Sequence, residues 1–100
     1  MKRKEKRYYI YIIASKINGT LYIGVTGYLL VRSFQHRLKE KKDSFSAKYD
    51  VNRLVYYEVY KYVNDAILRE KQLKKWERKW KINLIEKDNS VWRDLFDNMI

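Results

Sequence analysis

Two strand-like runs joined by an Asn-Gly turn constrain the fold of this chain more than any other feature. The first run, Tyr8 to Ser15, is rich in β-branched and aromatic residues, and the second covers Leu21 to Thr26. Asn18 and Gly19, which separate them, both tolerate the positive φ angles of a tight hairpin turn. We therefore predict an antiparallel hairpin. Because the first run is almost continuously apolar, it is expected to be a central strand covered on both faces.

The alternation of side chains along this hairpin brings two tyrosines together. If the Asn-Gly pair forms a two-residue turn, Tyr11 lies opposite Thr26. Paired residues share a face and successive residues alternate, so Tyr11 and Tyr22 lie on the same face of the sheet. A register shifted by two residues on each strand keeps that relation and pairs the two tyrosines directly. Their hydroxyl groups are therefore expected to point into one site.

The next segments are predicted to be a helix, a surface loop and a third strand. The helix covers Tyr28 to Lys42, the loop Lys39 to Lys48 and the strand Leu54 to Tyr60. Arg32 and His36 are four residues apart and therefore neighbours on one side of the helix. They lie away from its apolar stripe, which consists of Leu30, Phe34 and Leu38.

A long helix is predicted to begin at Asn64 or Asp65, either of which can cap it, and to run to about Glu86. Glu70 lies at the margin of its apolar stripe, where a carboxylate calls for a compensating cation. The tail, Asp88 to Ile100, is predicted to form a short docking helix. The long helix is expected to bury Ala66, Leu73, Trp80 and Leu84, and the tail helix Trp92, Leu95 and Phe96.

These elements predict the α+β class, with a small three-stranded antiparallel sheet flanked by helices in the order β-β-α-β-α-α. One hundred residues with no proline and three glycines fit a single domain, residues 1–100, in which residues 1–7 are a flexible basic lead-in. The chain has no cysteine and hence no disulfide partner, and no run is long enough for a membrane helix. We expect a cytoplasmic protein.

The charge balance favours a polyanionic partner. The formal net charge is +11, from 23 Lys and Arg against 12 Asp and Glu. Each neutralised phosphate releases counterions and so favours binding, which makes nucleic acid the leading candidate partner. A generally basic surface that serves solubility is the alternative.

Several of these residues together resemble the GIY-YIG nuclease superfamily, most closely its short stand-alone bacterial members related to the nuclease domain of the excinuclease C subunit. The resemblance covers Tyr8 to Phe96, although Tyr9 stands where the family has glycine. It implies a GIY-YIG-like fold and a metal-dependent endonuclease acting on DNA. It rests on Tyr9-Ile10-Tyr11, Tyr22-Ile23-Gly24, Arg32, His36 and Glu70.

The resemblance also implies a role for each of these side chains. Tyr22 activates the attacking water with support from Tyr11, although a phenol needs nearby positive charge to act as a base. Arg32 contacts the scissile phosphate with its rigid fork of donors, and His36 orients groups or exchanges a proton. Glu70 holds one Mg²⁺ or Mn²⁺ ion together with phosphate oxygens and waters. A plain ion pair between Glu70 and Lys74 is the alternative, and the same reasoning admits Glu77.

Two further expectations concern an asparagine and a basic surface. The asparagine of the family corresponds to Asn83 by its spacing or to Asn89 at the predicted helix end. A nucleic-acid-binding surface is predicted from Lys71, Lys74, Lys75, Arg78 and Lys79, with Lys81, interleaved with Trp76 and Trp80. For the tryptophans a place in the core is the favoured alternative, and the lysines are also compatible with solvated charge. The main functional alternative is a nucleic-acid-binding module that does not cleave or needs a partner to do so. A basic scaffold for an acidic protein is a third possibility.

Overall fold

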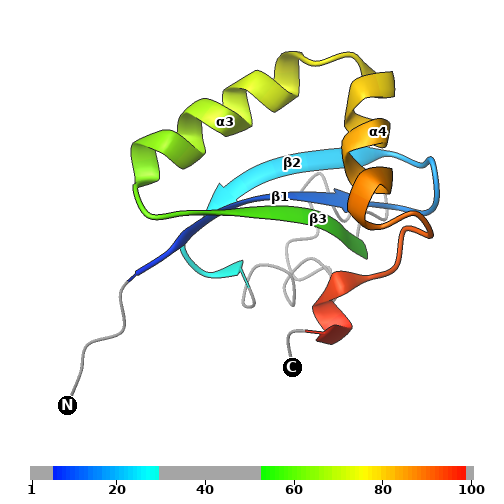
Figure 1. Ribbon diagram of the computed structural model, residues 1–100, viewed down its shortest axis with the longest axis horizontal. Helices are drawn as coiled ribbons and strands as arrows, with labels where there is room; N and C mark the ends of the chain where they lie inside the picture. The colour runs from blue at the N-terminus through cyan, green and yellow to red at the C-terminus, as the bar shows by residue number, and fades with distance from the viewer. Residues whose placement is uncertain (1–5, 30–52, 99–100) are drawn as a thin grey trace, which may run out of the picture.

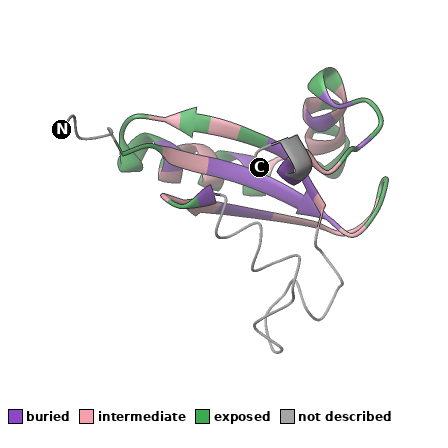
Figure 2. Ribbon diagram, turned by 90° about the horizontal axis from the view of Figure 1, so that it is seen from below, coloured by how far each residue is buried: buried purple, intermediate pink, exposed green. Residues whose placement is uncertain are grey.

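The computed structural model describes residues 6–29 and 53–98, which form a three-stranded antiparallel sheet with helices on it (Figure 1). The strands are β1 (Tyr8–Ala14), β2 (Leu21–Thr26) and β3 (Arg53–Tyr60), and their order in the sheet is β2-β1-β3. The predicted hairpin, third strand and central position of the first strand are confirmed. β1 is buried along most of its length, as Figure 2 shows in purple.

The hairpin turn is longer than predicted. Tyr11 lies opposite Gly24 rather than Thr26, so the predicted two-residue turn is wrong. Gly19 does not adopt the positive φ that such a turn requires, although Asn18 does, with φ 57°. Ser15 sets the register instead. Its backbone N–H donates to the carbonyl of Thr20 at 3.1 Å, and its hydroxyl accepts the N–H of Thr20 at 3.0 Å. The turn therefore comprises residues 16–19, and the shift of two leaves every side chain on its predicted face.

A bulge in β3 changes which of its residues face the helices. Ile12 pairs with Tyr56 but Ile13 pairs with Leu54, so Val55 is an extra residue on β3. Val55 and Tyr56 consequently both join the core on the helix-covered face, while Leu54 joins the core on the other face.

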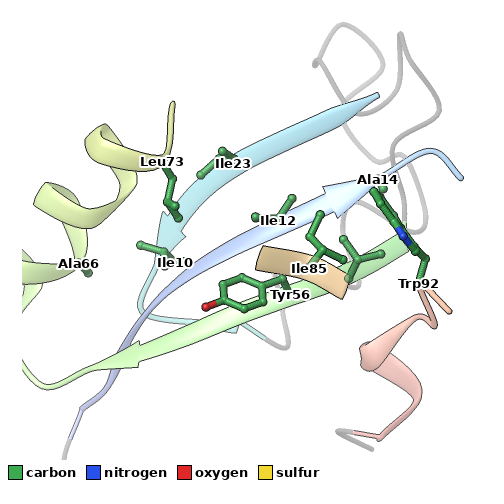
Figure 3. Packing of buried hydrophobic residues seen from close by; sticks show 10 residues of the cluster. Ile10, Ile12, Ala14, Ile23, Tyr56, Ala66, Leu73, Ile85 and Trp92 are labelled. Atoms are coloured by element: carbon green, nitrogen blue, oxygen red, sulfur yellow. The ribbon is translucent and has the colours of Figure 1, made fainter. Parts of the chain in front are cut away.

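The larger core lies between the sheet and two helices, α3 (Val63–Lys75) and α4 (Arg78–Asp88). Leu73 points from α3 toward Ile12 and Ile23 in the sheet, and Ile85 comes from α4 (Figure 3). All ten members of this core are at most 9% exposed: Ile10, Ile12, Ala14, Ile23, Val55, Tyr56, Ala66, Leu73, Ile85 and Trp92.

A second core covers the opposite face of the sheet. It contains Tyr11, Ile13 and Leu54 from the strands, together with Leu29 and Phe96. Phe96 belongs to the 3₁₀ helix η1 (Leu95–Asn98), which lies on the other side of the sheet from α3 and α4 (Figure 1). The fold therefore buries both faces of β1, which explains why its sequence is so uniformly apolar.

The predicted long helix is wrong in its length and its cap. It is divided into α3 and α4 at Trp76 and Glu77, which both have extended backbone with ψ near 148°. The residue before the first helical position is Tyr62, and no side chain caps it, so neither Asn64 nor Asp65 has that role.

The break resets which residues of the second helix are buried. A continuous helix would bury Trp80, but Trp80 is 51% exposed and Ile85 is buried instead. Leu84 is partly buried against the larger core, whereas Ala66 and Leu73 are buried as predicted. Because the sequence has no proline or glycine at the break, tertiary packing of α4 across the sheet decides where α3 ends.

The tail is folded differently from the predicted helix, and Asn89 helps to hold it. Trp92 precedes η1 with φ 57° and is fully buried, so it is not part of a helix. The carboxamide of Asn89 donates to the carbonyls of Val55 at 3.0 Å and Arg93 at 2.8 Å. Its oxygen accepts the N–H of Arg93 at 2.9 Å.

Two other predictions fall on residues outside the described ranges. Of the helix predicted over Tyr28 to Lys42, only the start lies within the described residues. The predicted loop, Lys39 to Lys48, lies wholly outside them. Within the ranges that are described, no helix is both long and apolar enough to cross a membrane.

Candidate active site

Two tyrosines form the centre of the sheet face opposite α3 and α4. Tyr11 on β1 lies opposite Gly24, and Tyr22 on β2 lies opposite Ile13, so the two side chains are diagonal neighbours on one face. Their ring centroids are 6.2 Å apart with the planes tilted by 41°. Tyr11 is only 2% exposed, whereas Tyr22 is partly exposed. Of the two, Tyr22 is therefore the one that a substrate on this face would meet.

Gly24 leaves the space that the ring of Tyr11 fills. A Cβ atom at position 24 would lie 2.4 Å from the Tyr11 hydroxyl oxygen and 2.5 Å from its Cζ. Glycine is therefore required here for close packing, not for an unusual φ angle. The Tyr-Ile-Gly sequence of β2 thus places the exposed tyrosine beside the buried one.

Further aromatic rings extend this face toward β3. Tyr9 and Tyr57 pack edge to face, with centroids 6.2 Å apart and planes at 65°. Tyr57 pairs with Tyr11 across the β1–β3 ladder, so it lies on the same face, and it is 37% exposed. Four tyrosines from all three strands therefore lie on this one face.

Glu70 lies on α3, which covers the other face of the sheet. In sequence it lies between the buried Ala66 and Leu73. At about 100° per residue, its side chain lies to one side of the stripe that those two residues form along the helix. Arg69 is displaced to the opposite side and reaches β3. Glu70 is therefore directed toward the side of α3 that faces the edge strand β2, which also carries Tyr22.

The Glu70 carboxylate is largely buried and has a single described ion pair. Its side chain is 15% exposed, and the Nζ of Lys74 lies 3.0 Å away with a side chain that is 54% exposed. The predicted alternative, an ion pair four residues along the helix, is therefore present. Such a pair with an exposed lysine contributes about 0.3–0.5 kcal/mol, so a stronger cation can displace it at little cost.

The donor set around Glu70 fits a metal ion that keeps much of its hydration shell. Within residues 6–29 and 53–98 no group of three or more acidic, histidine or cysteine side chains could hold an ion alone. One carboxylate supplemented by substrate phosphate oxygens and waters suits Mg²⁺. Arg32 and His36 lie outside the described residues.

The two candidate asparagines have different surroundings. Asn83 lies in the middle of α4 and is exposed. Asn89 is 7% exposed, and both donors and the acceptor of its carboxamide are used to hold the tail. Asn89 therefore has a structural role that the spacing argument did not anticipate, while Asn83 is accessible.

The predicted basic surface lies around the junction of α3 and α4, and its members differ in what they contact. Lys71, Lys75 and Lys79 are exposed, whereas Lys74 pairs with Glu70. Arg78 donates to the carbonyl oxygens of residues 18 and 19 in the hairpin turn, at 2.6 and 2.5 Å. Arg78 therefore joins α4 to the hairpin in addition to its predicted place among the basic residues.

A buried polar cluster beneath α3 was not predicted. Arg69 donates from Nε and Nη2 to the two carboxylate oxygens of Glu58, at 3.0 and 3.1 Å. The hydroxyl of Tyr60 donates to the same carboxylate at 2.6 Å, and that of Tyr56 donates to it from the other side. The alternate spacing of Tyr56, Glu58 and Tyr60 on one strand face is the sequence signal that predicts this arrangement.

The cluster shifts the protonation of each of its members. Burial alone would raise the pKa of Glu58, but the hydrogen bonds from Arg69, Tyr56 and Tyr60 outweigh burial and hold the pKa below its usual value. Burial and the contact with Glu58 raise the pKa of Tyr60 to about 12 and that of Tyr56 further. The hydrogen bond to Glu58 likewise raises the pKa of Arg69.

Comparison with known proteins agrees with this fold. Residues 7–83 match the model of the GIY-YIG catalytic domain. No sequence among the curated proteins matches the chain. A UPF0213 protein from Bacillus halodurans, whose structure was determined by NMR in solution, shares the fold with a TM-score of 0.54. It is 22% identical, and the similarity covers 88% of this chain and 92% of that one.

The matched region contains the tyrosine pair and Gly24, on β1 and β2, and Glu70, on α3. It covers more than three quarters of the 100 residues. The chain therefore belongs to the GIY-YIG family, a family of nucleases that act on nucleic acid.

Proposed function

We propose that this protein is a metal-dependent endonuclease that hydrolyses phosphodiester bonds in DNA. The observation that carries the proposal is the pairing of the exposed Tyr22 with the buried Tyr11 on one sheet face within the GIY-YIG match. The net charge of +11 supports a polyanionic substrate.

Each proposed role follows from the chemistry of the side chain. Tyr22 takes a proton from the attacking water, and Tyr11 holds the Tyr22 ring in place from the interior. Arg32 stabilises the negative charge that develops on the phosphate, and His36 orients groups around it. The buried surroundings of Tyr11 make it a rigid support rather than a proton acceptor.

Glu70 is proposed to hold one Mg²⁺ or Mn²⁺ ion. Its carboxylate is screened from water on most sides, and its lysine partner is free to swing away into solvent. A bound divalent ion would supply positive charge to the phosphate oxygens. The protein itself contributes the orientation of the carboxylate, which α3 fixes between Ala66 and Leu73.

The direct test is cleavage of plasmid and branched DNA by purified variants, with and without Mg²⁺. Glu70→Gln, Tyr22→Phe and Arg32→Ala are each expected to lower the cleavage rate at least about 100-fold, as for loss of a metal ligand, a general base or a charge-stabilising group. Glu70→Gln is also expected to weaken binding of Mn²⁺ measured by electron paramagnetic resonance. It should remain folded because its ion pair to an exposed lysine is weak.

Glu77→Gln is the matched control, because Glu77 is an exposed glutamate seven residues further along the same part of the chain. It should cleave at the wild-type rate. Full activity of folded Glu70→Gln or Arg32→Ala would overturn the assignment of roles. Salt-dependent binding without any nicking by the wild-type protein would instead support the non-cleaving module.

A further inference from the structure

Trp80 is an exposed aromatic ring in a defined orientation at the start of α4. It is 51% exposed, although tryptophan is usually buried. Its ring meets that of Trp76 edge to face, with centroids 6.0 Å apart and planes at 85°. This arrangement fixes the plane of Trp80 while leaving much of the ring accessible.

The support of Trp80 extends into the buried polar cluster. The guanidinium of Arg69 lies 5.0 Å from the centroid of the Trp76 ring. Arg69 is itself held by two hydrogen bonds to Glu58, at 3.0 and 3.1 Å. A continuous series of contacts thus runs from β3 through Arg69 and Trp76 to Trp80. A ring supported in this way loses little conformational entropy when it binds a ligand.

The surroundings of Trp80 are basic and polar. At about 100° per residue, Asn83 and Lys87 lie on the same side of α4 as Trp80, and Lys79 borders that side. All three neighbours are exposed. We call Trp80, Asn83, Lys79 and Lys87 the α4 platform. It combines an aromatic plane, an amide with a donor and an acceptor, and positive charge.

We propose that the α4 platform binds an unpaired nucleotide of the nucleic-acid substrate, with the base stacked on Trp80 and the backbone phosphates near Lys79 and Lys87. Every base presents a flat face that stacks on an aromatic ring, and lysines neutralise phosphates. Asn83 can bond the edge of the stacked base. The proposal deepens the nuclease function, since it names single-stranded or locally unpaired nucleic acid as the preferred substrate.

Duplex DNA and a second copy of this chain are poorer partners for this surface. Within a duplex the base faces are covered by neighbouring bases, so Trp80 could reach only a terminal or unpaired base. Two copies would bring surfaces of the same sign together in a chain of net charge +11. Charge complementarity therefore selects the nucleic acid.

The test is the affinity of metal-free protein, in EDTA, for three fluorescent oligonucleotides of equal length. These are a single strand, a blunt duplex, and a strand in which abasic sites replace the central nucleotides. Trp80→Ala is expected to weaken single-strand binding about 10-fold, within the range for losing one stacked base. Duplex and abasic binding should change less than about 2-fold, and the salt dependence should stay the same, because no charge is removed.

Leu68→Ala is the matched control. Leu68 is 60% exposed on α3, and its substitution also removes exposed apolar surface. Trp80→Phe should restore most of the single-strand affinity, and thermal unfolding of each variant verifies the fold. Equal weakening on all three oligonucleotides, or no weakening on the single strand, would overturn the proposal. Because no metal is present, the result is independent of whether Glu70 and Tyr22 support cleavage.

Discussion

Gly24 lies within β2 and Gly27 directly follows it, and the two glycines face neighbours that differ in freedom. A Cβ at position 24 would meet the hydroxyl oxygen and Cζ of Tyr11, whose ring is almost wholly buried. A Cβ at position 27 would meet the Cε of Lys6 at 2.7 Å, near the end of an exposed and flexible side chain. Lys6 can move aside, whereas Tyr11 cannot.

Gly24→Ala should therefore destabilise the protein by about 1–3 kcal/mol, the usual cost of overpacking a core. In a domain of this size each kcal/mol lowers the midpoint of thermal unfolding by about 4–8 °C. The variant should also cleave more slowly, because the displaced ring of Tyr11 moves Tyr22. Calorimetry and the plasmid assay measure the two effects.

Gly27→Ala is the control for this prediction and should unfold within about 2 °C of the wild-type protein, because the lysine can shift into solvent. If the two alanine variants unfolded at the same temperature, the close contact between position 24 and Tyr11 would not be the reason for the glycine.

At the scale of elements, the bidentate pair of Glu58 and Arg69 fixes α3 to β3. Each side chain is less than one quarter exposed, so loss of either partner leaves a mostly buried charge. Two tyrosine hydroxyls complete the coordination of the carboxylate. The position of α3, and with it the orientation of Glu70, therefore depends on a contact that does not involve Glu70 itself.

Glu58→Gln is expected to lower the free energy of unfolding at pH 7 by about 2 kcal/mol, the scale of hydrogen bonds to a charged group. Because the pKa of Glu58 is lower in the folded than in the unfolded state, its contribution is present above about pH 4.5 and is lost as the pH falls further. The variant should therefore lose less stability than the wild-type protein between about pH 5 and pH 3. Urea unfolding at a series of pH values measures both quantities.

The tyrosines of this cluster predict the opposite behaviour in alkali. The pKa of Tyr60 is raised to about 12, so its contribution to stability is present below the usual tyrosine pKa of about 10 and is lost as the pH rises toward 12.

Glu77→Gln, which removes an exposed carboxylate, is the control for Glu58→Gln and should follow the wild-type stability curve in acid. Identical acid curves for Glu58→Gln and the wild-type protein would contradict the assigned role of Glu58.

At the scale of the whole molecule, the distribution of positive charge is expected to matter more than its total. Lys71 and Lys75 are exposed near the end of α3. Lys61 and Arg93 are equally exposed but lie after β3 and in the tail. Pairs of substitutions at these positions remove the same charge from different places.

Lys71→Ala combined with Lys75→Ala should reduce the slope of log affinity against log salt by about 1.4, as expected for two lost phosphate contacts on a single strand. Lys61→Ala combined with Arg93→Ala should leave the slope close to the wild-type value. Titrations of the single-stranded oligonucleotide at four salt concentrations provide the slopes. Equal changes of the slope in both double variants would mean that nucleic-acid binding depends only on the net charge of the protein.

The sequence was sufficient for those features that depend on local periodicity. The strands, the central position of β1 and the shared face of Tyr11 and Tyr22 all follow from alternation, and a register error of two residues cannot change a face. The fold class follows from the order of these elements. Alternation therefore predicted the tyrosine pair, the part of the candidate site that lies on the sheet.

The features that were missed depend on contacts between distant segments. The break at Trp76 and Glu77 has no local breaker and reflects the packing of α4. The contact of Arg78 with the hairpin turn spans about 60 residues, and the pair of Glu58 and Arg69 joins a strand to a helix. Composition could identify these side chains as charged, but only the fold decides whether they meet phosphate, water or each other.

The bulge in β3 has a consequence for the order of folding events. It inserts Val55 beside the ladder, and the Val55 carbonyl accepts the Asn89 carboxamide, while Arg53 donates to the carbonyl of Trp92 at 3.2 Å. The start of β3 therefore provides the docking site for the tail. That site exists only after β1 and β3, whose paired ends Ala14 and Arg53 are 39 residues apart, have paired in the correct register. We therefore expect Trp92 to become buried only after β1 and β3 have paired.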